Sequence, residues 1–232
     1  MRLDKFLSES TEFSRKEIRE LIKKGAVTVS GEVKKKPDIQ VNAYCGIEIN
    51  GRSVAYKKYV YLILNKPQGY VSATEDKTHK TVTELVPEDY RHFDVFPVGR
   101  LDIDTEGLLI LTNDGEFAHQ VTAPKKNVYK RYFARVDAKL SASDRDAFGS
   151  GMEFKDFKAM PAKLEIVSDN EAYVEIAEGK FHQVKRMFER VGKTVTYLKR
   201  VKIGELSLPD GLKTGEITES DAELLRKAIF MR

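Results

Sequence analysis

The sequence predicts an α+β protein of two units: a small N-terminal unit of helices and short strands, and a larger one built on a mixed, largely antiparallel sheet. Two observations carry this prediction. Helical apolar spacing gives way to short strand patterns within residues 1–55, and strand and helix patterns alternate over residues 59–232. A chain of 232 residues with 41% apolar residues suffices for one large domain with a small attachment.

The first unit is predicted to open with two amphipathic helices. Apolar residues at helical spacing mark the first over residues 3–7. Ser14 and Glu17 form a capping box at the start of the second, and Gly25 is placed to end it. Alternating apolar residues around a Ser-Gly turn predict a short hairpin over residues 27–33.

Basic charge is concentrated in this unit. Residues 1–58 carry 13 Lys and Arg against 8 Asp and Glu, whereas the remainder carries 27 against 28. Such a basic head favours contact with a polyanion, with RNA as the leading candidate. A solvated, lysine-rich surface is the alternative, and on charge alone it is the preferred interpretation. The basic side chains expected to be exposed on this unit are Arg15, Arg19, Lys23, Lys24 and Lys34 to Lys36.

The second unit follows a short polar linker at residues 52–58. Its predicted strands cover residues 60–64, 129–136 and 172–177. A helix is predicted over residues 180–191, with its apolar residues on one face. Ser220 and Glu223 are predicted to form the capping box of a last helix.

Composition excludes several classes of protein. No apolar run approaches the ~20 residues that a membrane-spanning helix needs, and the N-terminus lacks the apolar segment of a signal peptide. Cys45 is the only cysteine, which excludes an internal disulfide and leaves no partner for a cysteine-based zinc site. We therefore expect a cytoplasmic protein without membrane association.

The segment Gly99 to Asp114 has the strongest chemical pattern. Arg100 and Asp102 follow a glycine and precede a fully apolar strand at residues 108–111. This arrangement would hold a charged carboxylate beside a cation at a sheet edge. A turn or capping role is the more common one for an isolated aspartate.

The same segment imitates the start of a calcium loop, with acidic side chains at Asp102, Asp104 and Glu106. The twelfth position of such a loop requires glutamate, and Asn113 stands there. The intervening residues suit a buried strand rather than a ligand loop. Calcium is therefore rejected, and no metal site is expected.

Two later segments combine basic and aromatic or titratable residues. Residues 125–135 hold five basic side chains and no acidic one, and strand alternation puts Lys130 and Tyr132 on one face. A core tyrosine on an amphipathic strand is the better interpretation without other evidence. A surface on which an extruded base stacks is the functional one.

Residues 179–202 hold eight basic residues and one acidic residue. His182, Lys185 and Arg186 flank one side of the predicted helix, opposite its apolar stripe. This bias is harder to explain as a generic solvated face, although a lone histidine is more often structural than catalytic.

Together these segments resemble the RsuA-type pseudouridine synthases. The residues from Gly99 to Asn113 look like the catalytic motif of that family along its full length, and the first unit resembles the S4 RNA-binding domain. Three shorter matches follow the expected order, at residues 65–69, 130–132 and 182–187. The resemblance implies an S4-like domain over residues 1–55 and a synthase catalytic domain over residues 59–232.

The resemblance implies isomerisation of a uridine in RNA to pseudouridine, in which C5 replaces N1 on the ribose C1′. Atoms and electrons are conserved, so no cofactor is implied. Asp102 is the implied essential carboxylate, acting as a nucleophile on the ribose or as an electrostatic and base catalyst. Tyr132 would stack on the uracil, and Lys185 would pair with Asp102, with Arg186 as the fallback for that pair.

Substrate binding is implied for further residues of these motifs. Arg100 would hold the extruded nucleotide or its phosphate, and extrusion costs a few kcal/mol that stacking and phosphate contacts must offset. The other implied contacts are Lys130, His182, Gln183 and Arg186, together with Arg15, Arg19, Lys23 and Lys24 of the S4-like unit.

The preferred hypothesis is a synthase acting on small-subunit (16S) ribosomal RNA, because the N-terminal residues and the turn after Asn65 look most like that branch. Alternatives are a synthase for large-subunit (23S) ribosomal RNA and a non-catalytic RNA-binding assembly factor. A metal-dependent nuclease using Asp102, Asp104 and Asp114 is disfavoured, because a buried strand follows the first carboxylates. The expected partner is ribosomal RNA or a pre-ribosomal particle, and the expected oligomeric state is a monomer.

Overall fold

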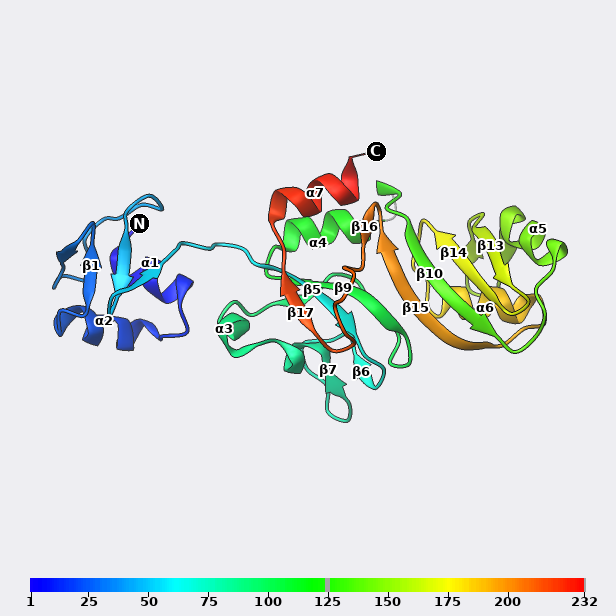
Figure 1. The fold of residues 1–232 in the computed structure, drawn as a ribbon, viewed down its shortest axis with the longest axis horizontal. Coiled ribbons are helices and arrows are strands. Elements are labelled where there is room, and N and C mark those ends of the chain that lie inside the picture. The colour runs from blue at the N-terminus through cyan, green and yellow to red at the C-terminus, as the bar shows by residue number, and fades with distance from the viewer. Residues whose placement is uncertain (124–125, 232) are drawn as a thin grey trace. The chain divides into compact units, whose positions relative to one another are not determined.

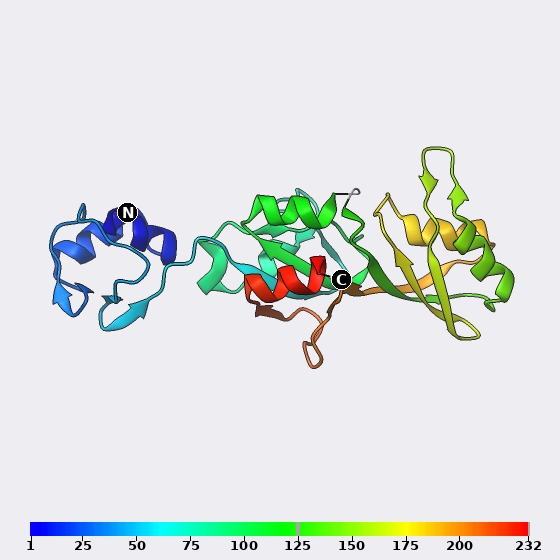
Figure 2. The ribbon, with the colours of Figure 1, turned by 90° about the horizontal axis from the view of Figure 1, so that it is seen from above.

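The computed structural model describes residues 1–123 and 126–231 (Figure 1; seen from above in Figure 2). The chain divides into two units. The first comprises Met1–Val60 with Val86–Val95, and the second comprises Tyr61–Leu85 with the chain from Phe96 onward. The segment Val86–Val95 lies within the range that the sequence assigns to the larger unit. No helix in the described ranges is long and apolar enough to cross a membrane.

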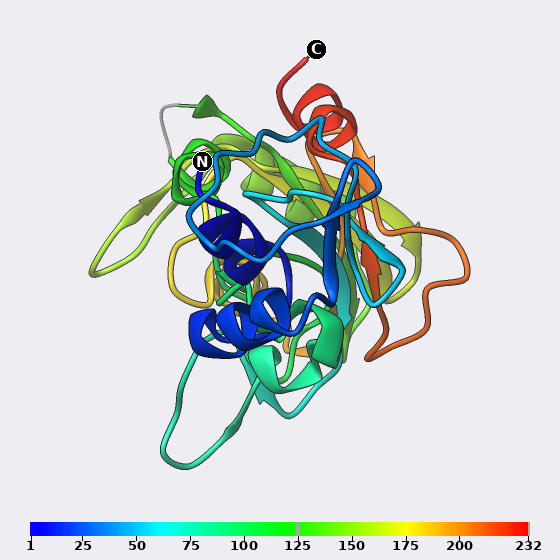
Figure 3. The ribbon, with the colours of Figure 1, turned by 90° about the vertical axis from the view of Figure 1, so that its left-hand side faces the viewer.

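The first unit packs two helices against a small sheet of strand order β2-β1-β3-β4, and Figure 3 shows the two helices (dark blue) beside each other. Its elements are α1 (Leu3–Ser10), α2 (Arg15–Lys23), β1 (Val27–Val29), β2 (Glu32–Val33), β3 (Ile47–Ile49), β4 (Arg52–Val54) and the short α3 (Glu88–Arg91). The apolar faces of α1, α2 and the strands form one core.

The local predictions for α2 are confirmed. The Ser14 hydroxyl accepts a hydrogen bond from the Glu17 backbone N–H, and the Glu17 carboxylate accepts one from the Ser14 N–H at 2.8 Å. Gly25 follows the helix with a φ of +77°, the left-handed conformation that glycine adopts without a steric cost. The helix is therefore fixed at both ends by its own sequence.

The predicted linker at residues 52–58 is wrong at its start, because Arg52–Val54 form β4, which pairs antiparallel with β3. Asn50 and Gly51 make the turn between them, with φ values of +51° and +75°. Asn-Gly is the strongest short-range hairpin signal. The Asn50-Gly51 pair therefore indicated a hairpin in the sequence. The polar side chains that surround it led instead to the prediction of a linker.

The second unit is built on one mixed sheet of strand order β13-β14-β10-β15-β9-β5-β17, with β16 paired to β15 and β8 to β9. Its strands are β5 (Tyr61–Lys66), β6 (Tyr70–Val71), β7 (Lys80–Thr81), β8 (Phe96–Pro97), β9 (Glu106–Thr112), β10 (Lys130–Val136), β11 (Met152–Glu153), β12 (Lys158–Ala159), β13 (Lys163–Ser168), β14 (Glu171–Ile176), β15 (Val195–Ile203), β16 (Leu206–Ser207) and β17 (Ile217–Glu219). Its helices are the 3-10 helix η1 (Val82–Leu85), α4 (Gly115–Thr122), α5 (Ala142–Ser150), α6 (Gln183–Arg190) and α7 (Ala222–Phe230).

Antiparallel pairs dominate this sheet, and β9 and β15 form its parallel junction. The predicted fold class, α+β with a mixed, largely antiparallel sheet, is confirmed. At the junction Gly107 pairs with Arg200 and has a φ of +104°. A Cβ atom at Gly107 would lie 2.2 Å from the Arg200 carbonyl oxygen, so only glycine lets the two strands meet here.

Helices α4 and α7 lie side by side over the β5–β9 part of the sheet (Figure 2). Phe117 of α4 packs edge-on against Tyr61 of β5, while Leu225 and Ile229 of α7 enter the same core. This layer supports β9, whose preceding loop carries Asp102.

Two predicted helix starts in this unit are wrong. Helix α7 is capped by Asp221 rather than Ser220, and the Asp221 carboxylate accepts from the N–H groups of Glu223 and Leu224. Helix α6 begins at Gln183 rather than residue 180, because His182 adopts a left-handed φ of +51°. Both shifts are of one to three residues, within the usual uncertainty at element ends.

Candidate active site

Segments far apart in the sequence meet around a pocket of about 60 Å³ in the second unit. Asp102 enters it from the loop before β9, Tyr132 from β10, and the start of α6 closes another side. The sequence-predicted residues that line it are Arg100, Asp102, Tyr132, His182, Gln183 and Lys185. The fold therefore gathers at one place the catalytic candidates that the sequence distributes over 86 positions.

An ion-pair network forms the polar side of this pocket. The Lys185 ammonium lies 3.2 Å from the Asp102 carboxylate and 2.5 Å from that of Asp104. His182 Nε2 lies 3.6 Å from the other Asp102 oxygen. The predicted pair between Asp102 and Lys185 is thus present, and Asp104 is a second partner that the sequence analysis did not assign.

The charged state of this network is set by competition between burial and pairing. Burial alone would raise the pKa of the Asp104 carboxyl, but the Lys185 hydrogen bond and charge outweigh it and lower that pKa. Burial likewise lowers the pKa of the Lys185 ammonium, while Asp104 and Asp102 raise it above the ordinary value. Lys185 therefore stays cationic beside the two carboxylates at neutral pH.

Lys66 holds the loop that carries Asp102. This side chain is fully buried at the end of β5, and its ammonium donates to the backbone carbonyl oxygens of Pro67, Asp102 and Thr105 at 2.9–3.0 Å. Burial lowers its pKa to about 8. No role was predicted for Lys66, although the sequence offers a signal: a lysine that ends a buried strand and directly precedes a Pro-Gln-Gly turn.

Tyr132 is buried, with 8% of its surface exposed, and lines the pocket. Strand alternation places Phe133 on the opposite face, against Tyr173 and Tyr197. Lys130 donates to the Val121 carbonyl oxygen at 3.5 Å, and burial lowers its pKa to about 8. Of this strand, Tyr132 is therefore the residue that reaches the pocket.

Arg186 points to a different partner. Its guanidinium forms a two-pronged ion pair with Asp156, at 2.9 and 2.5 Å, and lies over the rings of Phe154 and Phe157. It anchors the β11–β12 hairpin to α6, while Lys185 holds the place beside Asp102.

Gln183 is also engaged within the protein. Its amide donates to the Glu178 carboxylate at 3.0 Å and accepts from the Lys180 N–H at 3.0 Å. It lines the pocket while bracing the turn that leads into α6.

The three carboxylates of the nuclease alternative are not brought together. Asp114 is buried and occupied elsewhere: it accepts from the Tyr61 hydroxyl at 2.6 Å, the Phe117 N–H at 3.0 Å and the Arg226 guanidinium at 2.9 Å. Within the described residues, no group of three His, Cys, Asp or Glu side chains could hold a metal ion.

The basic residues predicted for RNA binding in the first unit are exposed to different extents. Arg15 and Arg19 are about half exposed and pair with Asp4. Lys23 pairs with Glu20 at 3.7 Å, and Lys24 is the exposed C-cap of α2. Lys125, part of the basic stretch at residues 125–135, lies outside the described residues.

Comparison with known proteins follows the same division of the chain. Residues 60–190 match the RNA pseudouridylate synthase family, and residues 1–43 match the S4 domain. The chain resembles a crystal structure of a pseudouridylate synthase with a TM-score of 0.70 and 32% identity, over 99% of this chain and 100% of that one.

Relatives share similarity over the whole length. An uncharacterized RNA pseudouridine synthase of Bacillus subtilis is 41% identical over 98% of this chain and 99% of its own. The ribosomal small subunit pseudouridine synthase A of Vibrio cholerae is 37% identical over 98% and 100%, and that of Pseudomonas aeruginosa is 38% identical over 96% and 98%. The chain therefore belongs to the RNA pseudouridine synthase family, with an S4 domain ahead of its synthase domain.

Proposed function

We propose that this enzyme converts one uridine of small-subunit ribosomal RNA to pseudouridine, with Asp102 as its catalytic carboxylate. The observation that carries the catalytic assignment is the pocket in which Asp102 pairs with Lys185 and faces Tyr132. The small-subunit assignment is supported by the full-length similarity to synthases named for that RNA.

The reaction is an isomerisation within one nucleotide. The bond between uracil N1 and ribose C1′ breaks, the uracil turns, and C5 bonds to C1′. The proton lost from C5 is balanced by one gained at N1. A carboxylate in contact with the ribose stabilises the positive charge that develops at C1′, either by bonding to it or by removing a sugar proton.

Asp102 is a better candidate than Asp104 for this role. Both carboxylates share the Lys185 ammonium, but 29% of the Asp102 side chain is exposed against 62% for Asp104. Asp102 lines the pocket together with Tyr132, whereas Asp104 pairs with the same ammonium without lining the pocket. A partly desolvated carboxylate next to an aromatic ring fits a sugar whose base stacks on that ring.

The other pocket residues have supporting roles in this proposal. Tyr132 offers its ring to the uracil and its hydroxyl to a proton transfer. Arg100 is exposed at the pocket and carries a charge suited to the phosphate of the extruded nucleotide. His182 contributes a second polar group beside Asp102.

Mapping pseudouridine in transcripts of small-subunit ribosomal RNA tests the proposal, using carbodiimide modification and primer extension. The RNA is supplied bare and with bound ribosomal proteins. We expect one new stop with the wild type and none with Asp102→Asn. Asp104→Asn is the matched control, since it removes a carboxylate from the same ammonium, and it is expected to keep activity within about tenfold.

The other outcomes separate the alternatives. A stop in large-subunit RNA alone would reassign the substrate, and tight RNA binding without any stop would favour an assembly factor. We expect the protein to meet its ribosomal RNA substrate in the cytoplasm and to act as a monomer. Cell fractionation and analytical ultracentrifugation test these two expectations.

A further inference from the structure

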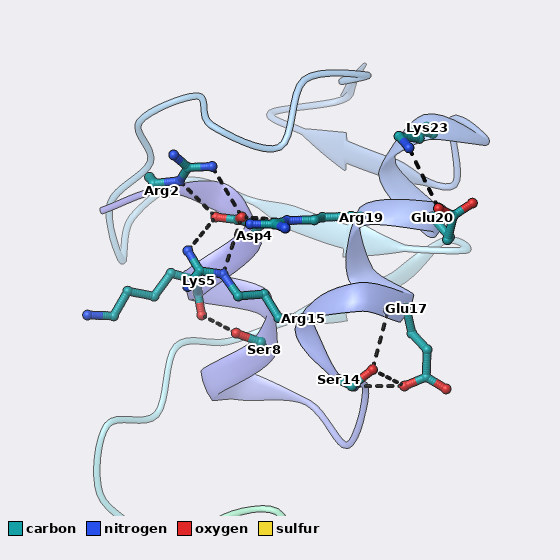
Figure 4. Close-up of polar contacts among 10 residues, drawn as sticks. All are labelled: Arg2, Asp4, Lys5, Ser8, Ser14, Arg15, Glu17, Arg19, Glu20 and Lys23. Carbon is teal, nitrogen blue, oxygen red and sulfur yellow. Dashed lines mark hydrogen bonds and ion pairs between the residues drawn. The ribbon is translucent and has the colours of Figure 1, made fainter.

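One buried carboxylate of the first unit takes no part in the proposed reaction. Asp4 of α1 is fully buried and accepts hydrogen bonds from three guanidinium groups, those of Arg2, Arg15 and Arg19, at 3.1–3.3 Å. Figure 4 shows the three side chains converging on it. Arg2 directly precedes α1, while Arg15 and Arg19 lie one turn apart on α2.

The cluster carries excess positive charge. Three guanidinium groups face one carboxylate, and in the part of the chain that the structure describes no other carboxylate lies within ion-pair distance of them. Burial alone would raise the pKa of Asp4, but the hydrogen bonds from the arginines outweigh it and hold that pKa well below the usual range. Asp4 therefore stays ionised, and the four side chains together carry a net charge of +2, with the Asp38 carboxylate acting on Arg2 at longer range.

Each of the three arginines binds Asp4 with part of its guanidinium group and leaves the rest of that group available to a second acceptor. Between 44% and 49% of each side chain is exposed. Arg2 and Arg15 each give Nε and one terminal nitrogen to Asp4, and Arg19 gives its Nε. Each guanidinium has five N–H donors, so each retains donors for a second acceptor, and phosphate oxygens suit this fork geometry.

We infer that Asp4 is a positioning residue for a phosphate-binding face formed by Arg2, Arg15 and Arg19, with RNA phosphodiesters as the ligand. Free arginine side chains lose rotamer entropy when they bind, and Asp4 has already fixed these three. The inference rests on the proposed function for RNA as the ligand. It adds a role for an acidic residue in binding a polyanion.

The sign of one substitution tests it. Asp4→Asn removes a negative charge, so simple charge attraction predicts unchanged or tighter RNA binding, whereas loss of positioning predicts weaker binding. In filter binding of the full chain to a small-subunit ribosomal RNA transcript, we expect about tenfold weaker affinity and a shallower salt dependence. Glu20→Gln removes a negative charge from α2 at a side chain that pairs with Lys23 rather than with the Asp4 cluster, and it is expected to bind at least as tightly as the wild type.

Two further sets of variants distinguish a loss of folding from a loss of arginine positioning. Arg15→Lys with Arg19→Lys keeps the charge at half-exposed positions and loses the fork, so it should also weaken binding. In an Arg15→Gln, Arg19→Gln background, Asp4→Asn should cause little further loss. Thermal unfolding of every variant is measured in parallel.

Undiminished affinity of a folded Asp4→Asn protein would overturn the inference. An equal loss on adding Asp4→Asn to the Arg15→Gln, Arg19→Gln background would overturn it as well. If Asp4→Asn does not fold, the lysine pair decides, and full affinity in that variant overturns it. Binding is measured without turnover. Absence of pseudouridine would therefore count against the proposed function alone.

Discussion

Lys185 stands between two carboxylates, and its charge is what lets them lie so close together. Two carboxylates that share one partly desolvated site repel each other, and a cation bound to both offsets that repulsion. The neighbouring Arg186 cannot take this place while it is bound to Asp156. One position along α6 therefore separates a residue of the pocket from a residue that anchors a hairpin.

The Lys185→Gln variant tests whether the Lys185 charge holds Asp102 in place. We expect kcat to fall about 100- to 1,000-fold, because the carboxylates lose the cation that holds Asp102 in place. RNA affinity should change little, because the basic residues of the S4 domain remain. Single-turnover kinetics at saturating RNA measure kcat, and Lys163→Gln on the exposed face of β13 is the control. A loss of affinity with an unchanged kcat would contradict this role.

Gly107 is the basis of a prediction about stability at the junction of β9 and β15. Gly107→Ala puts a Cβ against the Arg200 carbonyl oxygen and forces a non-glycine residue to a positive φ. We expect a loss of about 3 kcal/mol in the free energy of unfolding. Urea denaturation measures it. Gly115→Ala, at the first residue of α4 with nothing within 4 Å of the new Cβ, should be neutral or stabilising.

Individual elements are joined in the second unit by buried polar residues. Asp114 links three of them: it caps α4, accepts from Tyr61 on β5 and pairs with Arg226 on α7. Burial would raise the pKa of this carboxyl, but the Tyr61 and backbone hydrogen bonds and the Arg226 charge lower it below its ordinary value. The arrangement fixes two helices to the sheet through one side chain.

Asp114→Asn should lower the free energy of unfolding by about 2 kcal/mol at pH 7, since charge-assisted hydrogen bonds are removed. The folded-state pKa lies below the unfolded-state value, so this stabilisation is complete above about pH 4 and is lost as the pH falls through the folded-state pKa. Urea titrations of both proteins at several pH values measure the difference. A difference that stayed constant to the lowest pH would exclude the ionised carboxylate as its source.

Elements with an unambiguous local signal were predictable from the sequence, and those fixed by tertiary contacts were not. The Ser14 capping box and the apolar core of β9 are examples of the first kind. The start of α6 was missed because the left-handed His182 has no local signature. Ser220 was preferred over Asp221 because both residues are good caps and the spacing to Glu223 favoured the former.

For the pocket, the sequence supplied Asp102, Tyr132 and Lys185 through resemblance, and the structure brings them together. Lys66 was not assigned a role because its hydrogen-bond acceptors are backbone carbonyl groups. Its place at the end of a buried strand marks the lysine as unusual, but no pattern in the sequence shows what it binds. Asp104 was considered only as a metal ligand. Residues that act through backbone contacts or shared partners become visible only in three dimensions.

At the scale of the whole molecule, we expect the S4 domain to contribute affinity and the synthase domain to contribute the chemistry. Replacing Lys23 and Lys24 with glutamine should raise KM several-fold and reduce kcat less than twofold. The slope of log affinity against log salt should become shallower by about 0.7 to 0.9 for each phosphate that the protein no longer neutralises. Steady-state kinetics and filter binding over a salt series measure both. An unchanged slope would show that these lysines do not bind RNA phosphates.

The parallel junction of β9 and β15 also determines how much of the chain must be synthesised before the pocket can form. Asp102 emerges from the ribosome well before Lys185 and the strand that pairs with Gly107. Until that later segment has emerged and joined the sheet, the carboxylate has no cation beside it and the pocket has no second wall. The pocket of a nascent chain therefore stays incomplete until α6 and β15 have left the ribosome and packed beside β9.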